Sequence, residues 1–108
     1  MKGKVYLIGE LNGSPSKYKL GITKREVRTR LSEHQTGAST KLIIIGIYES
    51  EYYTKIETAL KNQYSMYRTE GGTEWFELPD NIMNDFLLEC KKAERTFSFL
   101  KDSGNPFI

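Results

Sequence analysis

The alternation of apolar and polar positions along the chain predicts a small domain that mixes strands and helices. Short apolar runs rich in β-branched and aromatic residues are typical of strands, and they occupy residues 4–8, 18–23, 41–50 and 75–78. Apolar positions that recur every three or four residues are typical of helices, and they occupy residues 26–36, 52–67 and 81–100. We therefore expect a mixed α+β fold of order β-β-α-β-α-β-α, with three to four largely antiparallel strands flanked by three helices. The turn formers at residues 12–16 predict a hairpin between the first two strands.

The length of 108 residues suits one domain with one core. We expect residues 1–80 to form the main domain, residues 81–100 a C-terminal helix and residues 101–108 a loose tail. The run at residues 41–50 is strongly apolar, so we expect it to be a central strand buried on both faces. The C-terminal helix carries an apolar stripe of Ile82, Phe86, Cys90, Ala93, Phe97 and Leu100. This stripe either packs on the protein's own sheet or forms a seam between two copies of the chain.

The helix at residues 52–67 places a carboxylate among apolar side chains. Tyr53, Glu57, Leu60 and Tyr64 follow one another at spacings of four, three and four, which puts them on one face. A buried carboxylate must be paired, protonated or bound to a metal, because burying it bare costs several kcal/mol. Glu57 is therefore either a metal ligand or one half of a structural ion pair.

Two more polar side chains are expected on inward faces. Arg30 lies three residues after Val27 and four before His34, in line with the apolar stripe of the first helix. Its guanidinium could hold a phosphate through two hydrogen bonds, or could pair with Glu57 as a structural bridge. Tyr6 lies in the middle of the first strand, where it is either a half-buried aromatic or a functional phenol.

The charge is unevenly distributed. Residues 1–68 carry 12 Lys and Arg against 6 Asp and Glu, whereas residues 69–108 carry 4 against 8. The excess is densest at residues 17–30, whose six basic side chains are Lys17, Lys19, Lys24, Arg25, Arg28 and Arg30. Such a surface is either an ordinary solvated face or one that concentrates nucleic-acid phosphates.

The sequence also excludes several classes of protein. No apolar run approaches the roughly 20 residues that span a bilayer, and the start lacks the pattern of a signal peptide. Cys90 is the only cysteine, so neither a disulfide nor a cysteine zinc site is expected, and the setting should be reducing and cytoplasmic. The sequence holds no phosphate-binding glycine loop and no catalytic triad. Phosphodiester cleavage is the enzyme class that its inward acid, guanidinium and phenol fit.

The order of the motifs resembles the GIY-YIG endonuclease superfamily. These motifs are KVYLIG at residues 4–9, YKLGIT at 18–23, RTRLSEH at 28–34 and a glutamate in the helix after the next apolar strand. The chain is most similar to a branch, found in phage and cellular proteins, whose second motif reads K-I-G-x-T and which closes on E-W-F. Here the closing motif contains Trp75, the large anchor of its short strand. The resemblance covers residues 3–78 and leaves the C-terminal helix outside.

The resemblance implies a role for each matching residue. Tyr6 would activate the nucleophile or act as the base, and Arg30 would steady the scissile phosphate. Glu57 would hold a single divalent metal, usually Mg²⁺, with Mn²⁺ as the other choice. Gly21 would allow close backbone approach, and His34 matches a position where many members carry a histidine. The implied function is metal-dependent hydrolysis of a DNA phosphodiester bond, on duplex or branched DNA.

One residue departs from the superfamily pattern. Lys19 stands where the second motif has its tyrosine. A lysine there could act as a base, lower the pKa of a nearby water or contact a phosphate. This departure keeps two alternatives open: a nucleic-acid-binding module that has lost catalysis, and a protein-interaction domain on an old nuclease fold.

Overall fold

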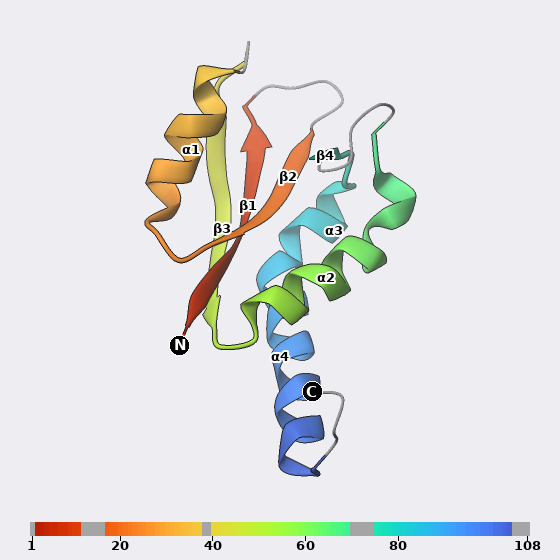
Figure 1. The fold of residues 1–108 in the computed structure, drawn as a ribbon. Helices are drawn as coiled ribbons and strands as arrows, with labels where there is room; N and C mark the ends of the chain where they lie inside the picture. The colour runs from red at the N-terminus through yellow and green to blue at the C-terminus, as the bar shows by residue number, and fades with distance from the viewer. Residues whose placement is uncertain (1, 12–16, 38–39, 70–74, 105–108) are drawn as a thin grey trace.

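The computed structural model describes residues 2–11, 17–37, 40–69 and 75–104 and has the expected mixed α+β architecture (Figure 1). In chain order its elements are β1 Gly3–Glu10, β2 Tyr18–Thr23, α1 Val27–Thr36, β3 Leu42–Ser50, α2 Tyr53–Gln63, the 3₁₀ turn η1 Ser65–Tyr67, β4 Trp75–Phe76, α3 Asp80–Asn84 and α4 Phe86–Asp102. The expected hairpin tip at residues 12–16 and the end of the expected tail lie outside the described residues.

The four strands form one antiparallel sheet in the order β3-β1-β2-β4. The expectation that residues 41–50 form a central strand is wrong, because β1 is central and β3 has a strand neighbour on one side only within the described residues. Burial of β3 is partial on both faces: Ile44 packs with the α1 side and Ile45 with the opposite side, whereas Ile47 is 44% exposed. An edge strand with apolar contacts on both faces has a sequence nearly as apolar as that of a central strand, which explains the error.

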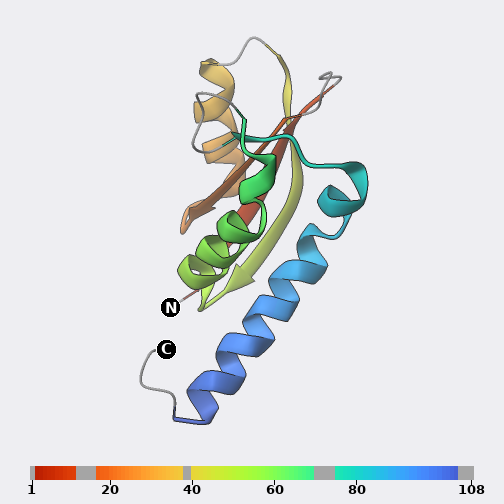
Figure 2. The same ribbon diagram turned by 90° about the vertical axis from the view of Figure 1, so that its right-hand side faces the viewer.

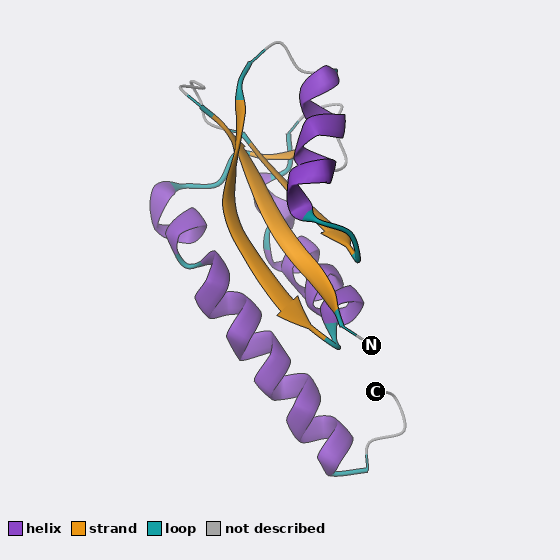
Figure 3. Cartoon of the chain, turned by 90° about the vertical axis from the view of Figure 1, so that its left-hand side faces the viewer, coloured by secondary structure: helices purple, strands orange, loops and turns teal. Residues whose placement is uncertain are grey.

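Alternation along β1 divides the core between the two faces of the sheet, as the sequence predicted. Val5 and Leu7 belong to the larger core cluster, which includes Ile56 of α2 and Phe86 of α4. Tyr6 and Ile8 face the other way and pack with Val27 at the start of α1. Figure 3 shows the corresponding layers, with α1 on one side of the sheet and α4 on the other. This division matters for the site, because Tyr6 points toward α1.

The expected C-terminal helix of residues 81–100 is broken into α3 and α4 at Asp85. The Asp85 backbone N–H donates to the Ile82 carbonyl, which closes α3 after one turn. The first half of α4 packs on the protein's own sheet, where Phe86 and Cys90 are fully buried. Cys90 is therefore the small core residue that its stripe predicted, and burial raises the pKa of its thiol to about 12.

Two hydrogen bonds attach α4 to neighbouring elements. The Tyr48 hydroxyl of β3 donates to Glu94 at 2.7 Å, and the Gln63 amide at the end of α2 donates to Glu89 at 3.2 Å. Figure 2 shows that α4 then continues past the end of the sheet. Within the described residues, no helix has both the length and the apolarity that a membrane span requires.

Candidate active site

A cavity of about 220 Å³ lies along β2, between α1 and α2. β4 pairs with β2 only at Tyr18 and Lys19, so the rest of β2 has no second strand neighbour among the described residues. Helix α1 approaches from one face of the sheet and α2 from the other. The residues that line the cavity are Tyr6, Lys19, Leu20, Gly21, Ile22, Arg30, His34, Glu57 and Lys61. All five side chains that the sequence nominated for catalysis therefore face one cavity.

Tyr6 reaches the cavity across its cross-strand partner, Gly21. The two residues are paired in the register of β1 and β2. A Cβ placed on Gly21 would overlap the hydroxyl and ring carbon Cζ of Tyr6. The glycine thus leaves the space in which the phenol lies, which is the close approach that the second motif implied.

The Tyr6 hydroxyl is hydrogen-bonded to Nε2 of His34 at 3.2 Å. Tyr6 is almost fully buried, at 1% exposure, and the two rings are tilted with centroids 6.4 Å apart. Either group can donate in this bond, depending on the tautomer of the imidazole. This contact links β1 to α1 at His34, which lies one helical turn beyond Arg30.

Arg30 faces both the cavity and a neighbouring acid. Its Nη1 donates to Glu33 at 3.0 Å, and its Nε is buried without a hydrogen-bond partner in the described structure. A hydrogen bond between the guanidinium and the adjacent Tyr6 is the main cause that raises the pKa of Arg30, and Glu33 adds to it. The structural bridge to Glu57 considered from the sequence is not the pairing seen here. The buried Nε is instead a donor that an incoming oxygen atom could satisfy.

Glu57 is largely buried, with a side chain only 15% exposed. One of its oxygens lies 3.6 Å from Nζ of Lys61, one helical turn further along α2. Ile56, the residue before Glu57 and not one of the four on the predicted face, is fully buried in the core. The face of α2 is therefore rotated slightly from the one the spacing suggested, which leaves Glu57 beside the core and open to the cavity.

Lys61 is the cavity residue that the sequence reasoning missed. Its position four residues after Glu57 was the available signal, because such pairs meet on a helix surface. Its side chain is 31% exposed. Of the described residues, three cations therefore line the cavity (Lys19, Arg30 and Lys61), against the single carboxylate of Glu57.

Lys19 belongs to β2 and is buried to 8% exposure. Its ammonium lies 5.8 Å from the ring centroid of Trp75 in β4. A cation over an indole face is a favourable pair, worth about 0.5–2 kcal/mol. Trp75 therefore anchors its strand and also helps to place Lys19 at the cavity wall.

The remaining basic residues of the nominated surface lie outside the cavity. Lys24, Arg25 and Arg28 are exposed, and Lys17 is partly exposed. The Arg25 guanidinium pairs with Glu33 at 3.1 Å and lowers the pKa of that carboxyl. Lys24 and Arg28 flank the start of α1 and remain the surface most accessible to a polyanion.

The donor set of the cavity limits the metal that it could hold. Within the described residues, no group of three or more His, Cys, Asp or Glu side chains is gathered as a metal site. Among the residues that the structure describes, Glu57 is the one carboxylate that lines this cavity. A single carboxylate fits Mg²⁺, which keeps most of its waters and takes only one or two protein carboxylates. It does not fit structural zinc, which needs four protein ligands.

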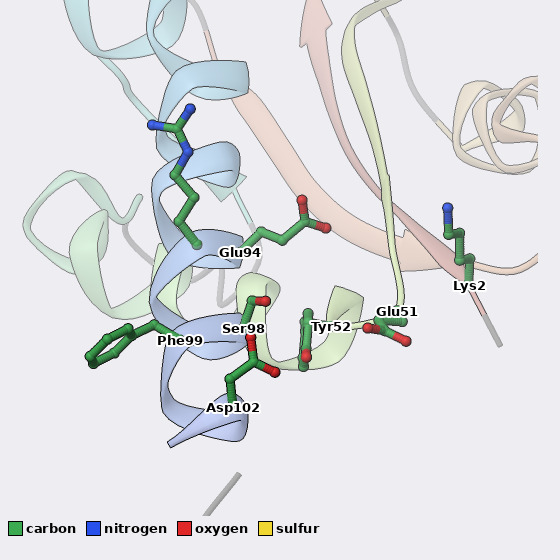
Figure 4. Close-up of a pocket in the computed structure, with 8 residues that line it drawn as sticks. Lys2, Glu51, Tyr52, Glu94, Ser98, Phe99 and Asp102 are labelled. Atoms are coloured by element: carbon green, nitrogen blue, oxygen red, sulfur yellow. The ribbon is translucent and has the colours of Figure 1, made fainter. Parts of the chain in front are cut away.

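Two other cavities differ in their lining. One of about 450 Å³ adjoins the first and shares Lys19 and His34 with it. The other, of about 600 Å³, lies between the start of α2 and the far part of α4, where Tyr52 and Glu94 line it (Figure 4). None of the site residues that the sequence nominated lines this cavity of about 600 Å³.

The described residues form a small α+β domain with a polar cavity along β2, and comparison with known families identifies the class of the domain. The chain belongs to the T5orf172 domain family, whose sequence model matches residues 3–95. This phage-associated family is related to nucleases. The match continues past residue 78 and includes the first half of α4, which the motifs had left outside. No curated protein and no solved structure matches the chain.

Proposed function

We propose that this domain is a metal-dependent endonuclease that hydrolyses a DNA phosphodiester bond by a single-metal mechanism of the GIY-YIG type. The observation that supports this proposal most strongly is that Tyr6, Arg30 and Glu57 line one cavity. They come from a strand and two helices on opposite faces of the sheet. Core packing alone gives no reason for a phenol, a guanidinium and an acid to meet there.

The scissile phosphate would be held by the cations of the cavity. Nε of Arg30 is a buried donor without a partner, and a phosphate oxygen would satisfy it. A guanidinium can bind two oxygens of one phosphate, which fixes the orientation of the group as well as its position. Lys19 and Lys61 line the same cavity and would add positive charge as negative charge builds on the phosphate.

The Tyr6–His34 pair would move the proton of the attacking water. The two groups are already hydrogen-bonded at 3.2 Å, so a proton accepted by one can pass to the other. Arg30 holds the phosphate beside this pair, which brings the water and the phosphorus together. Lys19, the residue that replaces the second-motif tyrosine, lies at the same wall and would contact the phosphate rather than serve as the first proton acceptor.

Glu57 would hold the divalent cation, most suitably Mg²⁺ or Mn²⁺. Its carboxylate is mostly buried, and its present partner Lys61 is partly exposed, so the ammonium can turn toward solvent. When bound, a divalent cation stabilises charge on the phosphate and on the leaving oxygen. Lys61 would then be placed to contact the DNA backbone next to the cut.

The test is incubation of the wild-type domain with supercoiled plasmid. The proposal expects conversion to nicked and linear forms with Mg²⁺ or Mn²⁺ and none when a chelator is present. A second candidate function, a DNA-binding module without catalysis, is favoured by Lys19 and by the existing Arg30–Glu33 and Glu57–Lys61 pairs. Salt-sensitive binding of the plasmid with no nicking under any metal would establish the binding module and overturn the nuclease.

A further inference from the structure

The cavity of about 450 Å³ beside the proposed active site has a different chemistry. Lys19 and His34 form the wall that the two cavities share. The other residues that line it are Glu10, Glu33, Gly37, Thr40 and Trp75. A ligand that spanned both cavities would therefore pass Lys19 and His34 on its way from one to the other.

The charges of the two cavities favour different parts of a nucleotide. Counted over the part of the chain that the structure describes, the active-site cavity has three cations and one carboxylate, which suits a phosphate. The adjoining cavity shares Lys19 but adds the carboxylates of Glu10 and Glu33, and that of Glu33 is paired with Arg25 and Arg30. The added carboxylates make this cavity less favourable to a phosphate, and carboxylate oxygens accept hydrogen bonds from neutral N–H groups.

Trp75 gives this cavity an aromatic wall. The indole is partly exposed and lies opposite the end of α1, near Gly37. Nucleobases stack on aromatic side chains, with about 1–3 kcal/mol gained for each base. Glu10 accepts a hydrogen bond from the Thr40 hydroxyl at 3.0 Å, which fixes its carboxylate on the rim. A carboxylate in that position can accept from the exocyclic amino group of a base.

We propose that the adjoining cavity binds a single unpaired nucleobase of the DNA substrate, next to the phosphate that is cut. Its volume lies within the range of about 300–1,000 Å³ that is usual for small-ligand sites. A base inside an intact duplex cannot enter it without leaving the stack. The preferred substrate would therefore carry an unpaired nucleotide at the cleavage position, as in a flap, a gap or a single strand. This inference rests on the proposed nuclease function for the identity of the neighbouring phosphate.

Trp75 is the only tryptophan of the chain, so its fluorescence reports this cavity alone. The wild-type protein is titrated with a short single-stranded DNA and with an abasic strand of the same length and charge. Stacking of a base should quench the fluorescence for the first strand, whereas the abasic strand should bind with little quenching. Equal quenching by the two strands, or none by either, would overturn the inference.

A pair of variants places the effect at this cavity. Gly37 lines it, and a Cβ built there meets no atom within 4 Å, so the leucine of Gly37→Leu would occupy open space. The affinity for the base-containing strand, measured by quenching, should be about tenfold or more lower in this variant. Thr36→Leu, at an exposed residue outside the cavity, should leave that affinity unchanged. If Gly37→Leu quenched like the wild type, the base would not bind in this cavity.

The same materials separate this inference from the proposed function. If the domain cuts flapped and fully paired DNA equally well and shows no base-dependent quenching, the base subsite is wrong and the nuclease proposal stands. If quenching depends on the base but no DNA is cut under any metal, the subsite stands and the nuclease proposal is wrong. If the wild type preferred flapped DNA and Gly37→Leu lost this preference through a raised KM, the result would support both the nuclease function and the base subsite.

Discussion

Gly21 and Tyr6 are direct partners across the β1–β2 pair, and the hydroxyl of Tyr6 lies where a Cβ of residue 21 would be. This relationship couples the sheet to the site: the strand residue with no side chain gives the phenol its place. Tyr6 can then reach His34 of α1, to which its hydroxyl is hydrogen-bonded. The first prediction follows from this contact.

Gly21→Ala should lower the free energy of unfolding by about 1–3 kcal/mol, because the new methyl group overlaps a buried ring that has little room to move. Urea unfolding followed by circular dichroism measures the change. Gly37→Ala is the matched control, since a Cβ there meets no atom within 4 Å, and its cost should stay below about 1 kcal/mol. Equal stabilities of the two variants would show that Tyr6 does not fill the space opposite Gly21.

Tyr6→Phe tests the phenol as a chemical group. The ring stays in its core position, so the fold should survive, whereas nicking should fall by about 10²–10⁴-fold because proton transfer is lost. Tyr48→Phe is the control: it removes a hydroxyl that is bonded to Glu94, outside the cavity. If Tyr6→Phe nicked DNA as fast as Tyr48→Phe, with the same pH profile, the proton-transfer role of Tyr6 would be wrong.

Arg30→Lys tests two-pronged phosphate binding. Lysine keeps the charge but cannot imitate the planar fork of a guanidinium, so nicking should fall by about 10²–10³-fold. Arg28→Lys, on the same helix but exposed and outside the cavity, should change the rate less than about twofold. Plasmid nicking rates of the two variants provide the comparison. If Arg30→Lys nicked plasmid as fast as Arg28→Lys, the positive charge alone would be sufficient and the two-pronged phosphate contact would be wrong.

High pH should unfold the domain through buried acids that must stay protonated. Burial, followed by the hydrogen bond to Glu94, raises the pKa of Tyr48 to about 12, and burial raises the pKa of Cys90 to about 12. Burial also raises the pKa of Tyr64. A pKa that is higher in the folded state than in the unfolded state gives stability that is complete below the unfolded value. That stability is lost as the pH rises through the folded value.

The expected loss of stability therefore lies between about pH 9 and pH 12, the interval between the ordinary pKa values of these groups and their raised ones. Denaturant unfolding at a series of pH values, with tyrosinate absorbance as the second signal, measures it. Tyr48→Phe should reduce the slope of stability against pH in this interval. Stability that stayed constant to pH 12 would contradict the burial of these groups.

The sequence predicted which side chains point inward better than it predicted the order of the strands. Spacing along a strand or helix determines which residues share a face, so the inward positions of Tyr6, Arg30 and Glu57 could be inferred one element at a time. Spacing does not determine which strand lies next to which. An apolar edge strand such as β3 therefore has the sequence pattern of a central strand. The order of sheet strands depends on contacts between distant segments, which no single element encodes.

The details that decide chemistry were also beyond the sequence. The break at Asp85 depends on a backbone hydrogen bond from its N–H to the Ile82 carbonyl, which ends α3 after one turn. That the Glu57–Lys61 pair lies at the cavity depends on the rotation of α2, in which Ile56 is buried in the core. The cavity beside Trp75 is lined by residues of β1, β2, β4 and the end of α1, which only the tertiary fold brings together. Each of these follows from tertiary packing and not from local pattern.

The central claim is that Glu57 holds the cation on which DNA cleavage depends, and Glu57→Gln tests it most directly. Glutamine keeps the size of the side chain but removes its charge, so the fold should remain while metal-dependent plasmid nicking falls by about a hundredfold or more. Glu49→Gln, at an exposed residue of β3, is the matched control and should nick like the wild type. A folded Glu57→Gln variant that nicked plasmid at the wild-type rate would contradict the account.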